Sequence, residues 1–290
     1  MERSGTHWVA ALLNSHPQIA CFPSQYWYPE EGRNKIGSVH FFDTLASLEG
    51  NTYKNTRDFN DFSFKYNNVF SDLVPLKESL SQKELLEKFI ERYSAYCEKQ
   101  KGTKDIVGES STGYVFVLPF MDRLYPNLKK ICIVRDPKDR IVSWHFNQVR
   151  KGRKKETDQI TEEFAFSYLN ERIIPEYEHL LSYDGDMLVL SYEGLHDNPQ
   201  KNVKKMLVYL GKTASDKDIE NMIQGGAFKR QTEKEEGYRK EKDGQDYTSG
   251  LRKGIAGDWK NYIETPLAEE IDQAMEGLSQ KVFEKYNMER

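Results

Sequence analysis

The sequence predicts an α/β fold in which a parallel sheet is flanked by helices within one domain spanning residues 1–290. The first observation is that helical patterns alternate with short buried-strand patterns, as in consecutive βαβ units. The second is that 290 residues can bury a sizeable core without disulfide or metal support. The third is the absence of any internal repeat or low-complexity tract, which excludes solenoid architectures.

The first half of the chain contains one strongly patterned helix. Apolar residues at i, i+3 and i+4 spacing predict an amphipathic helix over 82–99. The other expected elements are a helix over 7–14, an aromatic-rich region of loops and short helices over about 22–75, a short strand over 105–109, and a helix from about 114 to 125.

The second half contains the clearest strand, over 128–135, with the sequence LKKICIVR. Pro137 follows, at a position where proline favours the first helical turn, and it opens a helix to about residue 148. The remaining expected elements are a helix over 160–181, a buried strand over 186–192, helices over 199–210 and 216–224, a charged and glycine-punctuated excursion over 229–258 that is read as a mobile lid, and a final helix over 266–286.

Composition narrows the class of protein. With 42 Lys and Arg against 46 Asp and Glu, the net charge of -4 argues against a nucleic-acid binder held by bulk charge. The three cysteines (Cys21, Cys97 and Cys132) are widely spaced, which favours a reducing, cytoplasmic compartment and no zinc site. The longest aliphatic run has five residues, far short of the roughly 20 that a spanning helix needs. No signal-peptide pattern is visible at the start.

The first motif is RSGTHW over residues 3–8, directly before the first predicted helix. A helix N-terminus presents unpaired N–H groups and partial positive charge, which suits an anion. Gly5 allows close backbone approach, Ser4 and Thr6 add hydroxyl groups, and Arg3 adds a two-pronged cation. An ordinary capped helix is an equally good explanation of this hexapeptide alone.

The second motif begins at Arg135, at the carboxyl end of a predicted strand, and continues to Ser143, about two turns into the next helix. Ligands in open α/β sheets bind at the carboxyl ends of strands, where an arginine and a serine can bracket a phosphate. Residues 129–155 hold ten Lys or Arg and two Asp or Glu, a net of +8. The alternative is a solvated helix face with ion pairs.

The third motif is RKGIAGDWKN over residues 252–261. Arg252 and Lys253 stand before Gly254, so two adjacent cations on a glycine-flanked turn can close over an anion. A basic surface loop is the alternative.

The three segments, in this order, resemble the nucleotide-dependent sulfotransferases, which use 3′-phosphoadenosine-5′-phosphosulfate (PAPS). The 5′-phosphosulfate loop of that family is similar to RSGTHW, with Arg3 where a lysine is commonest. The family's 3′-phosphate segment has the same eight-residue interval as Arg135 to Ser143, and its RKGxxGDWKN motif is matched letter for letter at 252–261. The resemblance covers nearly the whole chain and implies a P-loop-like nucleotide-binding fold.

The resemblance also implies roles for individual residues. It points to PAPS as donor and 3′-phosphoadenosine-5′-phosphate (PAP) as product, without a metal. Tyr192 matches a tyrosine that the family places against adenine, and Phe228 is similar to one of its purine-sandwiching aromatics. The residues expected to hold the nucleotide are Arg3, Ser4, Gly5, Thr6, His7, Trp8, Arg135, Ser143, Tyr192, Phe228, Arg252, Lys253 and Gly254.

Two residues compete for the role of general base. Glu109, in the segment VGESST, resembles the glutamate proposed as base in carbohydrate-modifying and bacterial members, and is the first choice. His7 is the second, because the helix dipole favours a neutral imidazole there. Arg3 would stabilise the charge that develops on the transferring group. For Glu109 the alternative is a structural ion pair, and for His7 it is simple packing.

Several alternatives remain open at this stage. The family loop normally follows a buried central strand, and only Met1 and Glu2 precede Arg3, so the presence of the first central strand is left open. A catalytically impaired or truncated PAP(S)-binding homologue is therefore the alternative function, and a misplaced start codon is the simpler explanation. A nucleotide kinase is disfavoured because no Walker lysine is found. The expected partner is a small-molecule or carbohydrate acceptor, neither nucleic acid nor membrane, and a homodimer is left open.

Overall fold

A computed structural model describes residues 1–21, 41–50, 59, 73–213, 215–227 and 253–288. Contacts divide the chain into two compact units. The first unit is Thr6–Lys130 with Met1, and the second is Glu2–Gly5 with Ile131–Arg290. The boundary passes between Gly5 and Thr6, inside the first motif, and the single domain stays a prediction.

The first unit is built on a parallel strand pair. Strand β1 (Ile19–Cys21) follows helix α1 (Thr6–Asn14) and pairs with β2 (Ile106–Gly108), with Ile19 opposite Ile106. The chain between the two strands contains α4 (Gln82–Lys101), which supplies a crossover of the kind that parallel strands need. The other elements of this unit are α2 (Phe41–Ser47), α3 (Leu73–Leu76), the 3₁₀ turn η2 (Tyr114–Val117) and α5 (Leu118–Leu124).

Helix α4 begins at a capping box in which Ser81 and Glu84 satisfy each other's backbone N–H groups. Its buried stripe includes Phe89, whose ring stacks on Phe41 at a centroid distance of 3.9 Å. At the other end, the Lys101 ammonium donates to three carbonyls in the connection from α1 to β1. The helix is thus fixed at both ends.

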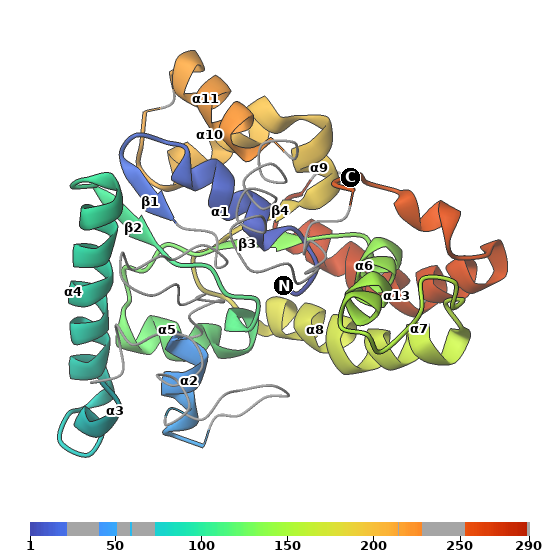
Figure 1. Cartoon of the computed structure of the whole chain (residues 1–290), viewed down its shortest axis with the longest axis horizontal. Helices are drawn as coiled ribbons and strands as arrows, with labels where there is room; N and C mark the ends of the chain where they lie inside the picture. The colour runs from blue at the N-terminus through green and yellow to red at the C-terminus, as the bar shows by residue number, and fades with distance from the viewer. Residues whose placement is uncertain (22–40, 51–58, 60–72, 214, 228–252, 289–290) are drawn as a thin grey trace. The chain divides into compact units, whose positions relative to one another are not determined.

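The second unit is built on a second parallel pair. Strand β3 (Ile131–Val134) pairs with β4 (Leu188–Ser191), and each is followed at once by a helix, α6 (Pro137–Arg150) and α9 (Tyr192–Asp197). Because the strands are parallel, their carboxyl ends meet at one edge, and the two helices start beside each other there. Figure 1 shows this edge at the start of α6.

The remaining helices of the second unit surround this pair. Helix α13 contacts both α8 and α6 (Figure 1). The elements are α7 (Glu162–Tyr168), the π-helical turn η3 (Leu169–Ile173), α8 (Ile174–Ser182), α10 (Pro199–Tyr209), α11 (Asp216–Gly226), the 3₁₀ turn η4 (Asp258–Asn261) and α13 (Thr265–Lys285).

The predicted helices and strands recur within a few residues of their expected bounds, with three differences. The helix expected over 160–181 is interrupted by the π-helical turn, just before Pro175 opens α8. Strand β1 and helix α9 were not expected from the sequence. Most of the predicted lid, and much of the aromatic-rich region, lie outside the described residues.

No helix in the described ranges has the length and apolar character needed to cross a membrane. The cytoplasmic location stays a prediction.

Candidate functional site

Two residues of the loop over 2–5 have left-handed backbone conformations, which side chains rarely adopt. Arg3 has a φ of 58° and Gly5 a φ of 97°. For Arg3 this left-handed conformation costs on the order of 1 kcal/mol, and such residues gather at functional sites. Ser4 is fully buried and its hydroxyl donates to the Glu2 carbonyl at 3.3 Å. At Gly5 a Cβ atom would lie 2.8 Å from the ring of Tyr192, so only glycine fits there.

A buried ion pair holds this loop from both sides. Arg140 of α6 and Glu176 of α8 are paired, with side-chain exposures of 0% and 2%. Arg140 Nε donates to the Glu2 carbonyl at 2.9 Å, and Glu2 N–H donates to Glu176 Oε1 at 3.2 Å. Burial alone would lower the pKa of Arg140, but the Glu176 carboxylate raises it above its usual value. The pair fixes the backbone immediately before Arg3.

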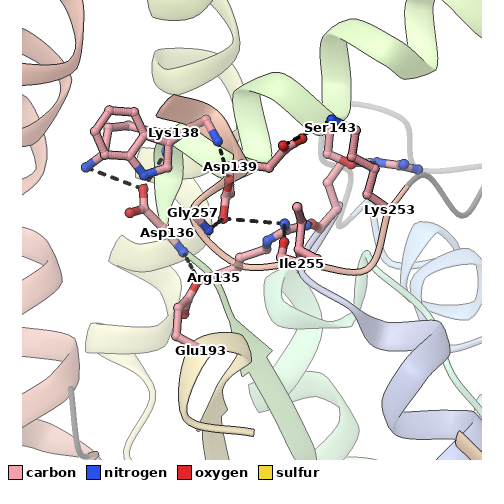
Figure 2. Close-up of polar contacts among 12 residues, drawn as sticks. Arg135, Asp136, Lys138, Asp139, Ser143, Glu193, Lys253, Ile255 and Gly257 are labelled. Carbon is pink, nitrogen blue, oxygen red and sulfur yellow. Dashed lines mark hydrogen bonds and ion pairs between the residues drawn. The ribbon is translucent and has the colours of Figure 1, made fainter. Parts of the chain in front are cut away.

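Arg135 leaves the carboxyl end of β3 and spans the site (Figure 2). Its guanidinium donates to the carbonyls of Ile255 at 3.0 Å and of Arg3 at 3.5 Å, and pairs with Asp139 at 3.5 Å. It also lies over the Tyr192 ring, 4.2 Å from the centroid. Its Nε is buried and has no hydrogen-bond partner among the described residues. A buried donor of this kind matches an acceptor group on a ligand.

Ser143 lies on α6 and links the first two motifs. Its Oγ accepts a hydrogen bond from Arg3 Nε at 3.0 Å. Burial is the main cause of a lowered pKa at Arg3, and the nearby cations Arg150 and Arg135 lower it further, after the opposing effects of Tyr168 and Glu2. A cation that is desolvated beside other cations is stabilised by a bound anion.

Asp139 docks the third motif on α6. Its carboxylate, which is fully buried, accepts from the N–H groups of Gly257 at 2.7 Å and Trp259 at 2.9 Å (Figure 2). Gly254 and Gly257 both have positive φ. The sequence did not single out Asp139 or Ile255, whose partners lie 118 to 120 residues away.

Lys253 lies in the third motif as expected. Its ammonium donates to Asp258 at 3.2 Å and to the Tyr262 hydroxyl at 2.9 Å, which raises its pKa. Arg252 and Phe228 lie outside the described residues. The second unit therefore brings together Arg3, Ser4, Gly5, Arg135, Ser143 and Tyr192, with Lys253 and Gly254 on the docked motif.

The start of α9 meets the start of α6. The Asp136 N–H donates to Glu193 Oε1 at 3.0 Å, and burial raises the pKa of both carboxyl groups. The buried ring of Tyr192 lies between the Gly5 backbone and the Arg135 guanidinium. The predicted contact between Tyr192 and adenine stays a prediction.

The other predicted site residues belong to the first unit. Thr6, His7 and Trp8 form the first turn of α1 and are partly buried. Glu109 directly follows β2 and is partly buried. Tyr114 is close to it: burial is the first cause of its strongly raised pKa, and the charge of Glu109 is the second. Among the described residues, no group of three His, Cys, Asp or Glu could hold a metal.

The Tyr114 hydroxyl also organises the surroundings of Glu109. It accepts hydrogen bonds from the N–H groups of Phe41 at 3.0 Å and Phe42 at 3.4 Å, at the start of α2. A hydroxyl that accepts from two backbone donors directs its own proton elsewhere, which suits a neighbouring carboxylate.

Comparisons with known proteins identify the family of this chain. A family model described as "Sulfotransferase domain" matches residues 1–287. A flavonol sulfotransferase-like protein of Flaveria bidentis is 31% identical over 166 residues, covering 52% of this chain and 54% of the relative. A 3-beta-hydroxysteroid sulfotransferase of Cavia porcellus is 29% identical over 171 residues, covering 53% and 58%. The chain spans about half the length of the curated relatives it matches.

Solved structures share the fold. The sulfotransferase domain of the Synechococcus PCC 7002 olefin synthase matches with a TM-score of 0.50 at 15% identity, covering 95% of this chain and 91% of the other. A retinol dehydratase solved with retinol and PAP also matches with a TM-score of 0.50, at 16% identity, covering 95% and 78%. The predicted fold class is confirmed.

Proposed function

Because this chain belongs to the sulfotransferase domain family, we propose that it transfers a sulfuryl group from PAPS to a hydroxyl or amine acceptor. The observation that carries the proposal is the junction of Arg3, Arg135 and Ser143 at one edge of β3 and β4. Two cations and a hydroxyl that converge at a strand end suit a phosphate group.

The residues present fit a nucleotide with two anionic groups. The buried Nε of Arg135 and the Ser143 hydroxyl would hold the 3′-phosphate. Arg3, with the backbone N–H groups of the loop, would hold the 5′-phosphosulfate. Lys253, on the motif that Asp139 docks, would add a further cation, and Tyr192 would contact the base.

The transfer breaks the bond from sulfur to the phosphate oxygen of PAPS and forms a bond from sulfur to the acceptor oxygen or nitrogen. PAPS supplies the sulfuryl group, and the acceptor oxygen or nitrogen bonds to sulfur as the bond from sulfur to the phosphate oxygen breaks. The proton of the acceptor passes to a base, and the products are the sulfated acceptor and PAP. Arg3 would stabilise the negative charge on the leaving phosphate, so that positioning and electrostatics supply most of the rate enhancement.

Glu109 is the base in this proposal, with His7 as the second choice. Glu109 directly follows β2 and lies close to the Tyr114 hydroxyl, whose pKa is raised. These neighbours support the view that the carboxylate is held in one orientation. A base must be oriented before its pKa matters, so Tyr114 would contribute by positioning.

The donor site is tested by calorimetric titration with PAP. We expect micromolar-class binding, weakened in Arg135→Ala by about 2–5 kcal/mol, because truncation leaves a ligand charge buried without its partner. Arg123→Ala, which removes an arginine that is 58% exposed in the first unit, is the control and should bind PAP normally. A folded protein that binds no PAP would exclude the proposal.

The base is tested by single-turnover kinetics. Glu109→Gln should keep PAP binding and lose about 10²–10⁴-fold in the rate of transfer, since the amide accepts no proton. An unchanged rate would assign the role elsewhere, and His7→Gln is then the next variant. The same measurement separates a sulfotransferase from a protein that only binds the nucleotide, because the latter shows no transfer in any variant.

A further inference from the structure

Five cations stand within six residues at the end of α6 and in the turn that follows. We call this segment, which comprises Arg150, Lys151, Arg153, Lys154 and Lys155, the basic turn. Backbone hydrogen bonds fix its shape, because Lys151 N–H donates to Asn147 at 3.2 Å and Arg153 N–H donates to Gln148 at 2.9 Å. All but Lys154, which is half-buried, are exposed, so the cations are presented on an ordered support.

Four of these cations have neutral partners. Arg150 donates to the Asn147 amide oxygen at 2.7 Å, and Arg153 to the Gln148 amide oxygen at 3.5 Å. The lysine ammoniums at 151 and 154 lie over aromatic rings, 5.5 Å and 4.5 Å from the centroids. Within the described ranges, no carboxylate forms an ion pair with any of the five side chains. None of the five is neutralised by a direct ion pair in this part of the chain.

The basic turn is electrostatically coupled to the donor site. Arg150 is close enough to Arg3 to lower its pKa. Burial is the first cause of the lowered pKa of Lys151, and its neighbours Arg153 and Arg150 come next. Glu2 opposes the shift, and Arg3 adds to it. Ser143 and Arg150 are separated by about two helical turns, or roughly 10 Å along α6. An anion bound at the basic turn therefore lies within reach of the reacting group.

The helix dipole explains only part of this cluster. A cation in the last turn of a helix is stabilised by the partial negative charge of the C-terminus, and the effect fades within that turn. Arg153, Lys154 and Lys155 lie beyond the end of α6 at Arg150. Like charges this close repel one another, so their crowding is more readily explained by a ligand that neutralises them.

We propose that the basic turn binds an anionic group, a carboxylate or a sulfate ester, on the same acceptor whose hydroxyl or amine receives the sulfuryl group. The inference rests on the proposed function and names its acceptor class: a polar acceptor that already carries a negative charge. The cations would hold that charge by electrostatic complementarity, which fixes the orientation of the acceptor and selects against neutral analogues.

The test compares acceptors that share a scaffold and differ in charge, such as a glucuronide with the matching glucoside, and 4-hydroxyphenylacetate with its amide. We expect kcat/KM to favour the anionic member by about tenfold at low salt. In Lys151→Gln/Arg153→Gln this ratio should fall towards one, mainly through KM, since the anionic group makes the same contact before and during transfer. A calorimetric titration of the PAP-saturated protein with the anionic acceptor should weaken in parallel.

The control removes the same charge elsewhere in the second unit. Lys204→Gln/Lys217→Gln neutralises two exposed lysines on α10 and α11 and should keep the preference. Turnover with a ratio near one, or a ratio that the basic-turn variant leaves unchanged, overturns the inference but leaves the proposed function standing. Loss of both PAP binding and turnover with every acceptor overturns the proposed function itself. Retention on immobilised heparin that depends on the basic turn, without any acceptor preference, would assign the surface to polyanions and also overturn the inference.

Discussion

The two ends of α6 carry the same kind of charge in opposite surroundings. At the first end, Arg135, Lys138 and Arg140 are buried, and each has a carboxylate partner. At the last end, the cations of the basic turn are mostly exposed, and four of them contact amides or aromatic rings. A buried charge is costly unless it is paired within the protein, whereas an exposed charge is solvated and can bind a ligand. The first end is therefore part of the framework, which also holds Arg135 in place for the nucleotide, and the last end presents its charges to solvent.

The largest expected effect is at the Arg140–Glu176 pair. Arg140→Ala should lower the free energy of unfolding by about 3–5 kcal/mol, because it leaves the Glu176 carboxylate buried without a partner. Urea denaturation, with the m-value compared between variants, measures the loss. The double variant Arg140→Met/Glu176→Leu should recover much of it. If Arg140→Ala alone lowers the free energy of unfolding by less than about 1 kcal/mol, the buried pair stabilises the protein no more than an exposed ion pair does.

A smaller effect is expected at Ser143, midway along the helix. Ser143→Ala removes the acceptor for Arg3 Nε and should weaken PAP binding by about 0.5–1.5 kcal/mol, with little change in unfolding. Ser143→Thr, which keeps the hydroxyl, is the matched control in the same calorimetric titration. If alanine and threonine weaken binding equally, the hydroxyl is irrelevant and only the space at this position matters.

The smallest effect, and of opposite sign, is expected at the last end. Lys155→Gln should raise the free energy of unfolding or leave it unchanged, within about 0.5 kcal/mol, because it relieves repulsion between like charges. Any gain should vanish at high ionic strength, where exposed charges are screened. Thermal melts at low and high salt provide the measurement. A clear destabilisation would mean that the basic turn, too, is part of the framework.

The sequence could predict what rests on local patterns. The helical stripe of α4 and the apolar run of β3 are long enough for their periodicity to be read, whereas the three residues of β1 are too few. The site residues Arg135 and Ser143 were located because their interval is local and matches a family motif. The π-helical turn inside the predicted 160–181 helix has no comparable signal.

What the sequence could not predict rests on partners far along the chain. The contacts from Arg140 and Glu176 to Glu2 join positions 138 and 174 residues apart, and no spacing rule relates them. The sequence shows the net charge of +8 over 129–155. It does not show that the cations at the start of α6 are buried and paired while those at its end are exposed. Glu109 remains a prediction from resemblance, supported by its neighbour Tyr114.

The docking of Gly257 and Trp259 on Asp139 limits how early the second unit can finish folding during translation. The buried carboxylate emerges from the ribosome 118 residues before the first of the two N–H groups that satisfy it. At about 5–20 residues per second, that interval is on the order of ten seconds. During this time the first turn of α6 holds a carboxylate whose nearby ion partner is Arg135. The second unit therefore reaches its final packing only after Trp259 has been synthesised, and a nascent chain arrested before Gly257 should expose this edge to chaperones.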